Sequence, residues 1–462
     1  DLIAPYKPEL KPKVMQGITT EITGNCGIGL APVNEEYKDE LKDYLSSFSE
    51  VNEINWKWNT LEDYMNYLED LKTTTNLAYL IPHGTLRLSV MGFDDRRPED
   101  SELRKMKEII RGGMNEGFFG ISTGLEYPPG SFSDTEELIE LTKEIKENNG
   151  YYASHMRSES KNVLKSIKEV IKISEKANVP AQVSHLKAEG KDVWGYSKKM
   201  KELIDKTREK NDVKCDLYPY KSFSTNFASI LPDWAQDGTS QDIVNRLKNT
   251  EKRKKIIKDI KNDNMNWNPI KTTGWSNIRV TGLKSEKYKP HDRWSIQEIS
   301  EKTNKDPYET AFDILIKEKS GGIMIGNSMT EKDIKNILQY QYTSICTDGL
   351  DIGKNPHPRL YGSFPKVIQE YALKKNYINI EEAIRKMTSL PAQRLGLKKG
   401  IIAEGYDADI TIFDPKKIKD KSSFKKPRKY PKGIEHVIIN GEIAVKKGEY
   451  TKQKPGKILK KQ

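Results

Sequence analysis

Four short apolar segments of this chain each close on a residue that can bind a metal or move a proton. TTEITGNC closes on Cys26, YYASH on His155, PAQVSH on His185 and YTSICTD on Asp348. Ligands from distant parts of a chain that all sit at strand ends can meet at one place, the rim of a parallel β-barrel. This repeated design therefore constrains the fold more than any other feature, and it indicates an enzyme.

Strand-like and helix-like segments alternate through most of the sequence. The predicted strands cover residues 18–25, 76–84, 117–124, 151–155, 180–185, 213–220 and 342–348. Between them, apolar residues recur at intervals of three and four, which is typical of amphipathic helices. This alternation predicts a parallel sheet with right-handed crossovers. A doubly wound open sheet is the alternative, but polar residues at nearly every strand end favour the closed (β/α)8, TIM-like barrel.

These segments account for seven strand–helix units, whereas a (β/α)8 barrel needs eight. The chain begins at Asp1 without a methionine, and DLIAPYKPELKPKVMQG reads like the interior of a longer sequence. We therefore expect the first barrel strand to precede Asp1.

Two regions interrupt or follow the alternation. Between the predicted strands at 213–220 and 342–348, residues 226–340 form a stretch that is too long for an ordinary loop. We expect an inserted subdomain there, with helices at about 240–260 and 295–318 and a capping box in SIQE. Residues 398–462 alternate with period two and carry an Asn-Gly turn, which predicts part of a small β-sandwich. The barrel domain is thus predicted to span 1–397.

Charge and cysteine content narrow the class of protein. The net charge is +11, mostly from lysines along predicted helices, and no nucleic-acid-binding motif accompanies it. A solvated lysine-rich surface is favoured over nucleic-acid binding. Apolar runs of 18 residues are missing from the sequence, which argues against a membrane span. Three widely spaced cysteines indicate a reducing, cytoplasmic compartment rather than a disulfide framework.

The strand-end residues suit a hydrolytic metal site. A catalytic zinc needs about three protein ligands and one open position, and Cys26, His155 and His185 supply that number. Zinc lowers the pKa of a coordinated water toward about 7, and Asp348 could take its proton and deliver it to a leaving nitrogen. Each residue also has a plainer interpretation. A lone cysteine is often a small buried hydrophobe, and Asp348 before glycine could simply begin a turn.

Taken together, the motifs resemble the D-aminoacylase, or N-acyl-D-amino-acid deacylase, branch of the amidohydrolase superfamily. The resemblance covers nearly the whole chain. It is carried by QGITTEITGNCGIGLAP, PHGTLR, GISTGLEYPPG, YASHMRSE, QVSHLKAEG, DLYPYKSFST, TDGLDIGKNPHPRLYGSFPKV, MTSLPAQRLGL and GIIAEGYDADITIFD.

This resemblance implies a zinc enzyme with one tight site. Most of the superfamily bridges two metals with a carboxylated lysine on the fourth strand, but GISTGL has no lysine, and in this branch Cys26 takes that place. By the same matching, Asp348 is the catalytic acid and base, and Tyr218 stabilises the oxyanion. Residues matching positions that contact the substrate are Tyr127, Lys187, Ser224 and Arg359.

One family feature is missing from the sequence. The family carries a His-x-His pair at the end of the first strand, which supplies a second, weaker metal position. None of the six histidines forms such a pair. Motif spacing would place the pair immediately before Asp1, and we expect it there.

The sequence therefore predicts zinc-dependent hydrolysis of the amide bond of N-acyl-D-amino acids, a small-molecule substrate. Alternatives are another amidohydrolase reaction, on a cyclic amide, a dipeptide or an N-acyl amine, and a non-catalytic basic binding protein on the same fold. The residues leave the substrate side chain and the oligomeric state open. Positive charge near the site would suit acidic side chains.

Overall fold

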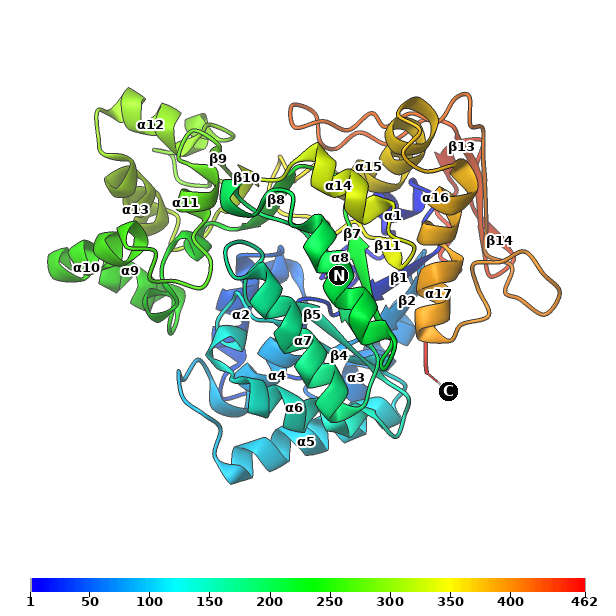
Figure 1. The fold of residues 1–462 in the computed structure, drawn as a ribbon, viewed down its shortest axis with the longest axis horizontal. Helices are drawn as coiled ribbons and strands as arrows, with labels where there is room; N and C mark the ends of the chain where they lie inside the picture. The colour runs from blue at the N-terminus through cyan, green and yellow to red at the C-terminus, as the bar shows by residue number, and fades with distance from the viewer. Residues whose placement is uncertain (1, 462) are drawn as a thin grey trace.

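The computed structural model describes residues 2–461. At its centre lie parallel strands in barrel order, covered by helices, as Figure 1 shows. The barrel strands are β1 (Thr20–Thr23), β2 (Asn76–Tyr79), its short continuation β3 (Ile81–Pro82), β4 (Gly120–Gly124), β5 (Tyr151–His155), β6 (Ala181–Val183), β7 (Val213–Leu217) and β11 (Thr343–Ile345).

Parallel pairing joins these strands in the order of a barrel. β1 pairs with β2, and the second sheet runs β3, β4, β5, β6, β7 and β11. The register aligns Gly124 with His155, so neighbouring strands end at the same level. The predicted barrel fold is confirmed. The strand and the His-x-His pair expected before Asp1 lie outside the described residues.

Most helices of the barrel are amphipathic, as their sequences predict, whereas α4 is buried along its whole length. They include α2 (Lys38–Ser46), α3 (Leu61–Leu71), α4 (His83–Met91), α5 (Asp100–Asn115), α6 (Thr135–Thr142), α7 (Val163–Ala177), α8 (Ser197–Arg208) and α14 (Glu331–Leu338). In α7, Val163, Ile167 and Val170 recur at intervals of three and four and are fully buried. Each such side chain contributes roughly 1.5–3 kcal/mol on burial, so this face fixes α7 against the strands.

A separate subdomain projects from one side of the barrel. Its antiparallel sheet has the order β8 (Ser222–Asn226), β10 (Ile323–Asn327) and β9 (Ile278–Thr281). Around it lie α9 (Ser240–Lys248), α10 (Thr250–Lys261), α11 (Pro269–Thr273), α12 (Ile296–Thr303) and α13 (Pro307–Lys317). The subdomain buries its own apolar cluster, apart from the barrel core.

Three details of this subdomain differ from the sequence expectation. The helix expected at about 240–260 is two helices, α9 and α10, which meet at Asn249. The helix expected over 295–318 is two helices, because Asn304 adopts a left-handed backbone with φ of 50° and Pro307 begins the next helix. The predicted limits were 226–340, whereas the small sheet begins with β8 at Ser222 and α14 already packs on α8 and β7 of the barrel. The SIQE capping box forms at Ser295.

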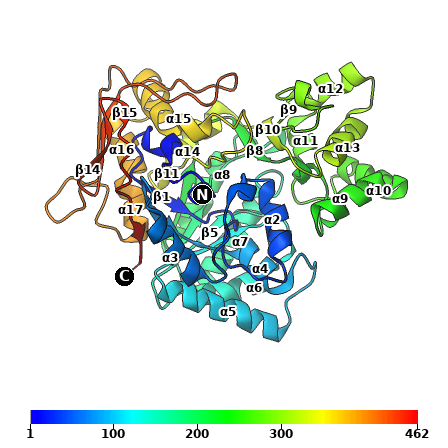
Figure 2. The same cartoon turned by 180° about the vertical axis from the view of Figure 1, so that it is seen from behind.

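The end of the chain forms a second small sheet on the opposite side of the barrel from the subdomain (Figures 1 and 2). Its antiparallel strands are β12 (Ile410–Phe413), β13 (Ile434–Ile439), β14 (Glu442–Lys446) and β15 (Glu449–Tyr450). The Asn-Gly turn at Asn440 joins β13 to β14, with Asn440 at φ of 50°. The last strand, β16 (Ile458–Leu459), leaves this sheet and pairs in parallel with β2.

Helices α15 (Arg359–Lys366), α16 (Ile380–Met387) and α17 (Ser389–Leu395), with the π-helix η8 (Val367–Lys374), connect the barrel to the final sheet. Ile368 of η8 and Val14 of α1 (Lys11–Val14) bury their side chains against Val437 and Val445 of that sheet. Throughout residues 2–461, every helix is too short or too polar to cross a membrane.

Candidate active site

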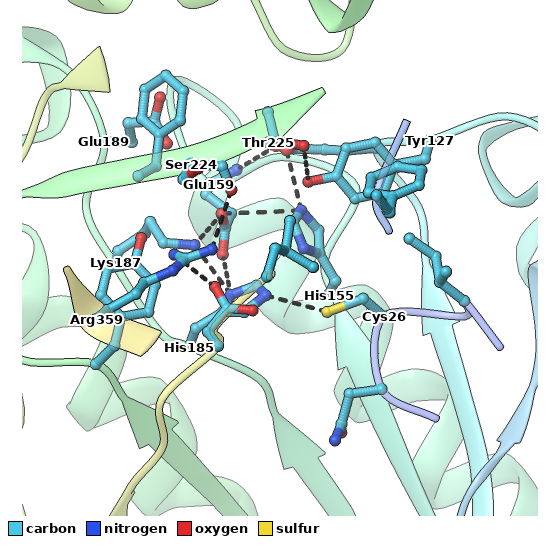
Figure 3. Close-up of a pocket in the computed structure, with 18 of the residues that line it drawn as sticks. Cys26, Tyr127, His155, Glu159, His185, Lys187, Glu189, Ser224, Thr225 and Arg359 are labelled. Atoms are coloured by element: carbon cyan, nitrogen blue, oxygen red, sulfur yellow. Dashed lines mark hydrogen bonds and ion pairs between the residues drawn. The ribbon is translucent and has the colours of Figure 1, made fainter. Parts of the chain in front are cut away.

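All nine side chains singled out in the sequence line one pocket at the carboxyl ends of the barrel strands. The pocket encloses about 670 Å³ of space, part of it open to solvent. Figure 3 shows most of these side chains pointing toward one another. The predicted residues that line it are Cys26, Tyr127, His155, His185, Lys187, Tyr218, Ser224, Asp348 and Arg359.

Cys26, His155 and His185 form a set of metal donors. One ligand atom from each lies within 4.8 Å of the others, and Cys26 Sγ is 3.4 Å from His185 Nε2. Zinc–sulfur and zinc–nitrogen bonds are about 2.3 and 2.0–2.1 Å long, so donor atoms this close can share one ion. One thiol and two imidazoles also match the chemistry that zinc prefers, and the residues present therefore fit a zinc ion.

The backbone at this site is held in a conformation that side chains rarely adopt. Cys26, His185 and Asp348 have positive φ values of 57°, 35° and 47°. Such strain costs about 1–3 kcal/mol for each residue and persists only where the surrounding structure enforces it. At Gly124, an added Cβ would lie 2.0 Å from the carbonyl oxygen of Cys26, so only glycine permits this close approach. The strained turns aim the three side chains into the pocket.

Buried carboxylates orient both histidines. His155 Nε2 lies 3.0 Å from Glu126 Oε2, and His185 Nδ1 lies 3.0 Å from Glu159 Oε1. The backbone N–H of His185 also donates to Asp216 at 2.8 Å. Carboxylate partners of this kind fix the ring orientation and tautomer of metal-binding histidines. The sequence analysis missed Glu126 and Glu159, although each follows a strand end that it had recognised.

Burial keeps the two imidazoles neutral. It lowers the pKa of His155 to about 4 and the pKa of His185 well below its usual value. A neutral imidazole has a free lone pair for a metal, so both rings are competent ligands at neutral pH. Burial raises the pKa of the Cys26 thiol, and the negative charge of Asp348 raises it further. A dication beside the sulfur would reverse that effect and favour the thiolate.

Asp348 and Arg359 form an ion pair across the pocket. Arg359 Nη1 lies 2.7 Å from Asp348 Oδ2, and Arg359 Nη2 donates to the carbonyl oxygen of Ser224 at 3.0 Å. Burial alone would raise the pKa of Asp348, but the positive charges of Arg359 and Lys187 outweigh it and lower that pKa. Asp348 is therefore ionised at neutral pH, and 25% of its side chain remains exposed toward the pocket.

Tyr218 lies between two cationic side chains. The centroid of its ring is 4.6 Å from Arg359 Cζ and 5.4 Å from Lys187 Nζ. Within the described structure its hydroxyl is buried and has no hydrogen-bond partner. Burial raises the pKa of Tyr218, so the hydroxyl stays protonated and can donate to a ligand. Lys187 is held by an ion pair with Glu159 and lies 2.9 Å from His185 Nδ1.

Comparison with known proteins identifies the family of this chain. The sequence model described as "Amidohydrolase family" matches residues 6–225 and 350–445, which is more than half of the chain. The chain belongs to the amidohydrolase family. The break between the two matched parts falls on most of the inserted subdomain and on β11, so this amidohydrolase resembles the family model least where the subdomain projects.

Individual relatives match nearly the whole of this amidohydrolase. D-aminoacylase from Alcaligenes xylosoxydans xylosoxydans is 31% identical over 98% of this chain and 83% of its own. N-acyl-D-aspartate deacylase from the same organism is 29% identical, over 98% and 81%. Among solved structures, N-acyl-D-glutamate deacylase from Bordetella bronchiseptica, complexed with zinc and a phosphonate inhibitor, is 27% identical. It has a TM-score of 0.81 and covers 100% of this chain and 86% of that one.

The inserted subdomain supplies one wall of the amidohydrolase pocket. Phe223, Ser224 and Thr225 come from β8, and Thr225 Oγ1 donates to the hydroxyl of Tyr127 at 3.1 Å. Trp267 reaches the same wall, where its Nε1 donates to Glu189 at 2.9 Å. The sequence analysis missed Thr225, Trp267 and Glu189, because nothing local to these residues indicates that they face the barrel mouth.

Two other histidines hold the surroundings in place. His83 Nε2 lies 3.0 Å from Glu137 Oε1 in a fully buried pair on the barrel helices, away from the pocket lining. His357 Nδ1 accepts the backbone N–H of Arg359 at 3.0 Å, which positions the start of α15.

Proposed function

We propose that this amidohydrolase is a deacylase that uses zinc to hydrolyse the amide bond of N-acyl-D-amino acids. The products are a carboxylate and a free D-amino acid. The observation that carries the proposal is one pocket that combines three metal donors, an ionised carboxylate and two buried cations. The named activities of its D-aminoacylase and deacylase relatives support it.

Cys26, His155 and His185 would hold one tight zinc ion, with Glu126 and Glu159 orienting the two imidazoles. When bound, zinc supplies Lewis acidity, which polarises a carbonyl group and lowers the pKa of water toward about 7. Zinc accompanies an inhibitor in the solved N-acyl-D-glutamate deacylase, which supports this choice of metal.

Asp348 transfers the proton in the proposed reaction. Because its pKa is lowered, it is ionised and can accept a proton from the attacking water. It then returns that proton to the amide nitrogen as the carbon–nitrogen bond breaks, so that the amine leaves neutral. The ion pair with Arg359 holds the carboxylate in place during both transfers.

Tyr218 stabilises the developing charge on the carbonyl oxygen. Its hydroxyl is protonated, buried and unpaired within residues 2–461, so it can donate to the oxygen without first breaking another hydrogen bond. A donor preorganised in this way is worth about 10²–10³ in kcat.

The α-carboxylate of the substrate binds near Arg359 and Lys187. Arg359 offers a planar fork that matches a carboxylate, and its Nε has no partner within the described structure. Ser224 and Tyr127 line the adjoining surface. Fixing both the α-carboxylate and the scissile carbonyl leaves one direction for the side chain, which distinguishes the D from the L form.

A substrate panel tests this function. The zinc-loaded protein is assayed with N-acetyl-D-amino acids, with their L forms and with dihydropyrimidines. We expect turnover of D forms, with kcat/KM at least about a hundredfold above that of the L forms, since reversed chirality misplaces the carbonyl. Turnover of cyclic amides alone would replace this proposal with another amidohydrolase reaction.

A further inference from the structure

The positively charged side chains in the pocket already form ion pairs with carboxylates of the protein. Among the described residues that line it, Lys187 and Arg359 are the two that carry a positive charge. Both are buried, and each is paired with a carboxylate, Lys187 with Glu159 and Arg359 with Asp348. The substrate's α-carboxylate would share these two cations, and a third cation for a second carboxylate is lacking in the described lining.

Carboxyl groups outnumber cations around the same space. Glu126, Glu159, Glu189 and Asp348 all line the pocket. Glu189 forms no ion pair within residues 2–461; its side chain instead accepts from the indole N–H of Trp267. Burial raises the pKa of Glu189 to about 8, as expected for a carboxyl without a cation. Glu189 is therefore largely uncharged at neutral pH. A further carboxylate entering this pocket would find no unpaired cation among the described lining residues, and it would compete with Glu159 and Asp348 for the two cations present.

The remaining walls are largely apolar, with Ser224 and Thr225 as uncharged polar residues on the insertion side. On the insertion side, Phe223 and Trp267 pack edge to face with ring centroids 5.2 Å apart. On the barrel side, the ring of Phe48 lies 6.0 Å from that of Tyr127, and Ile28 and Leu350 complete the wall. A substrate side chain that turns toward either wall meets aromatic or aliphatic surface.

From this distribution of charge we propose that the site selects N-acyl-D-amino acids with an uncharged, apolar side chain and rejects those with an acidic side chain. The inference rests on the deacylase function proposed above and narrows its substrate class. An apolar side chain gains free energy by leaving water at either wall. An acidic side chain would be buried without a cation, which a folded protein tolerates poorly. The site thus differs in preference from the relatives named for aspartate and glutamate.

The test compares kcat/KM of the zinc-loaded full chain for four substrates, the N-acetyl derivatives of D-leucine, D-methionine, D-glutamine and D-glutamate. We expect D-leucine and D-methionine to exceed D-glutamate at least a hundredfold. D-glutamine matches D-glutamate in size without its charge, and it should fall between them. Equal or better turnover of D-glutamate would overturn this inference and leave the deacylase function standing. Turnover of none of these D substrates would overturn both.

A designed cation sharpens the test. Leu350 is partly buried and lines the barrel-side wall, so Leu350→Lys brings a positive charge to the pocket, and Leu350→Met is the matched neutral control. We expect Leu350→Lys to raise the ratio of kcat/KM for D-glutamate over D-glutamine at least tenfold relative to Leu350→Met. An unchanged ratio in a Leu350→Lys protein that still hydrolyses D-glutamine would contradict the role assigned to charge.

Discussion

The barrel rim and the inserted subdomain face each other across one pocket, yet they are built differently. The rim presents Cys26, His185 and Asp348 from strained turns with positive φ, at the carboxyl ends of the parallel barrel strands. The subdomain presents Phe223 and Ser224 from the regular strand β8, and it has an apolar core of its own. The geometry of the catalytic residues thus depends on all the barrel strands together. Residues of the facing wall can be changed without moving those strands.

The largest effect is expected at the rim, for Asp348→Asn. The amide cannot accept the proton of water, and general acid–base catalysis contributes about 10²–10⁴ in rate. We expect kcat for N-acetyl-D-leucine to fall at least about a thousandfold, while zinc content, measured by mass spectrometry of the metal, stays the same.

The matched control for that variant is Asp39→Asn, because the Asp39 side chain is 99% exposed and is not among the described residues that line the pocket. It should retain full activity. Undiminished activity of Asp348→Asn itself would exclude the proton-transfer role.

A second rim variant removes one hydrogen bond. Tyr218→Phe keeps the ring between Arg359 and Lys187 but loses the free hydroxyl. We expect kcat to fall about a hundredfold with KM changed little, since the lost interaction forms mainly in the transition state. Steady-state kinetics measure both quantities.

Tyr220→Phe provides the comparison for Tyr218→Phe. Its hydroxyl is also buried, but Tyr220 is not among the described residues that line the pocket. A loss of kcat as large in Tyr220→Phe as in Tyr218→Phe would mean that the effect is structural.

The carboxylates behind the histidines should affect the metal rather than the substrate. Glu126→Gln keeps the size of the side chain beside His155 Nε2 but replaces the carboxyl group with an amide. Loss of such a partner costs about 10–100-fold in metal affinity, so we expect tenfold weaker zinc binding in competition with a chelator. Glu62→Gln, at the exposed start of α3, is the control. Unaltered affinity in Glu126→Gln would remove the orienting role of this carboxylate.

The smallest effect is expected from the facing wall. Trp267→Leu removes aromatic surface and the hydrogen bond to Glu189, but it touches none of the metal donors. We expect KM for N-acetyl-D-leucine to rise about threefold to tenfold, in line with the burial free energy of a few methylene groups. Zinc content and kcat should change little. A larger loss of kcat than in Tyr218→Phe would contradict the assignment of catalysis to the rim and of substrate binding to the facing wall.

Much of the fold could be predicted from local sequence patterns, because each barrel strand is specified by its own residues. The segments that close on His155 and His185 can be recognised from their own residues, because a short apolar run and a terminal polar residue are local features. The barrel then follows from their repetition. The site roles of these residues remain predictions that the variants above address.

The features that the sequence did not reveal depend on contacts across the fold. Glu159 gains its importance from His185, 26 positions away, and from Lys187. Trp267 faces the pocket because its subdomain supplies one wall of that pocket. The break between α12 and α13 was hidden because Asn304 takes a left-handed conformation that the neighbouring helical periodicity masks.

X-ray absorption at the zinc edge tests the central claim most directly, using the full chain and a Cys26→Ser variant. We predict about one zinc per chain in the natural sequence, with one sulfur at about 2.3 Å and imidazole nitrogens at about 2.0–2.1 Å. The sulfur shell should disappear in Cys26→Ser. A zinc shell of nitrogen and oxygen alone in the natural sequence, or spectra that do not change in Cys26→Ser, would contradict the claim.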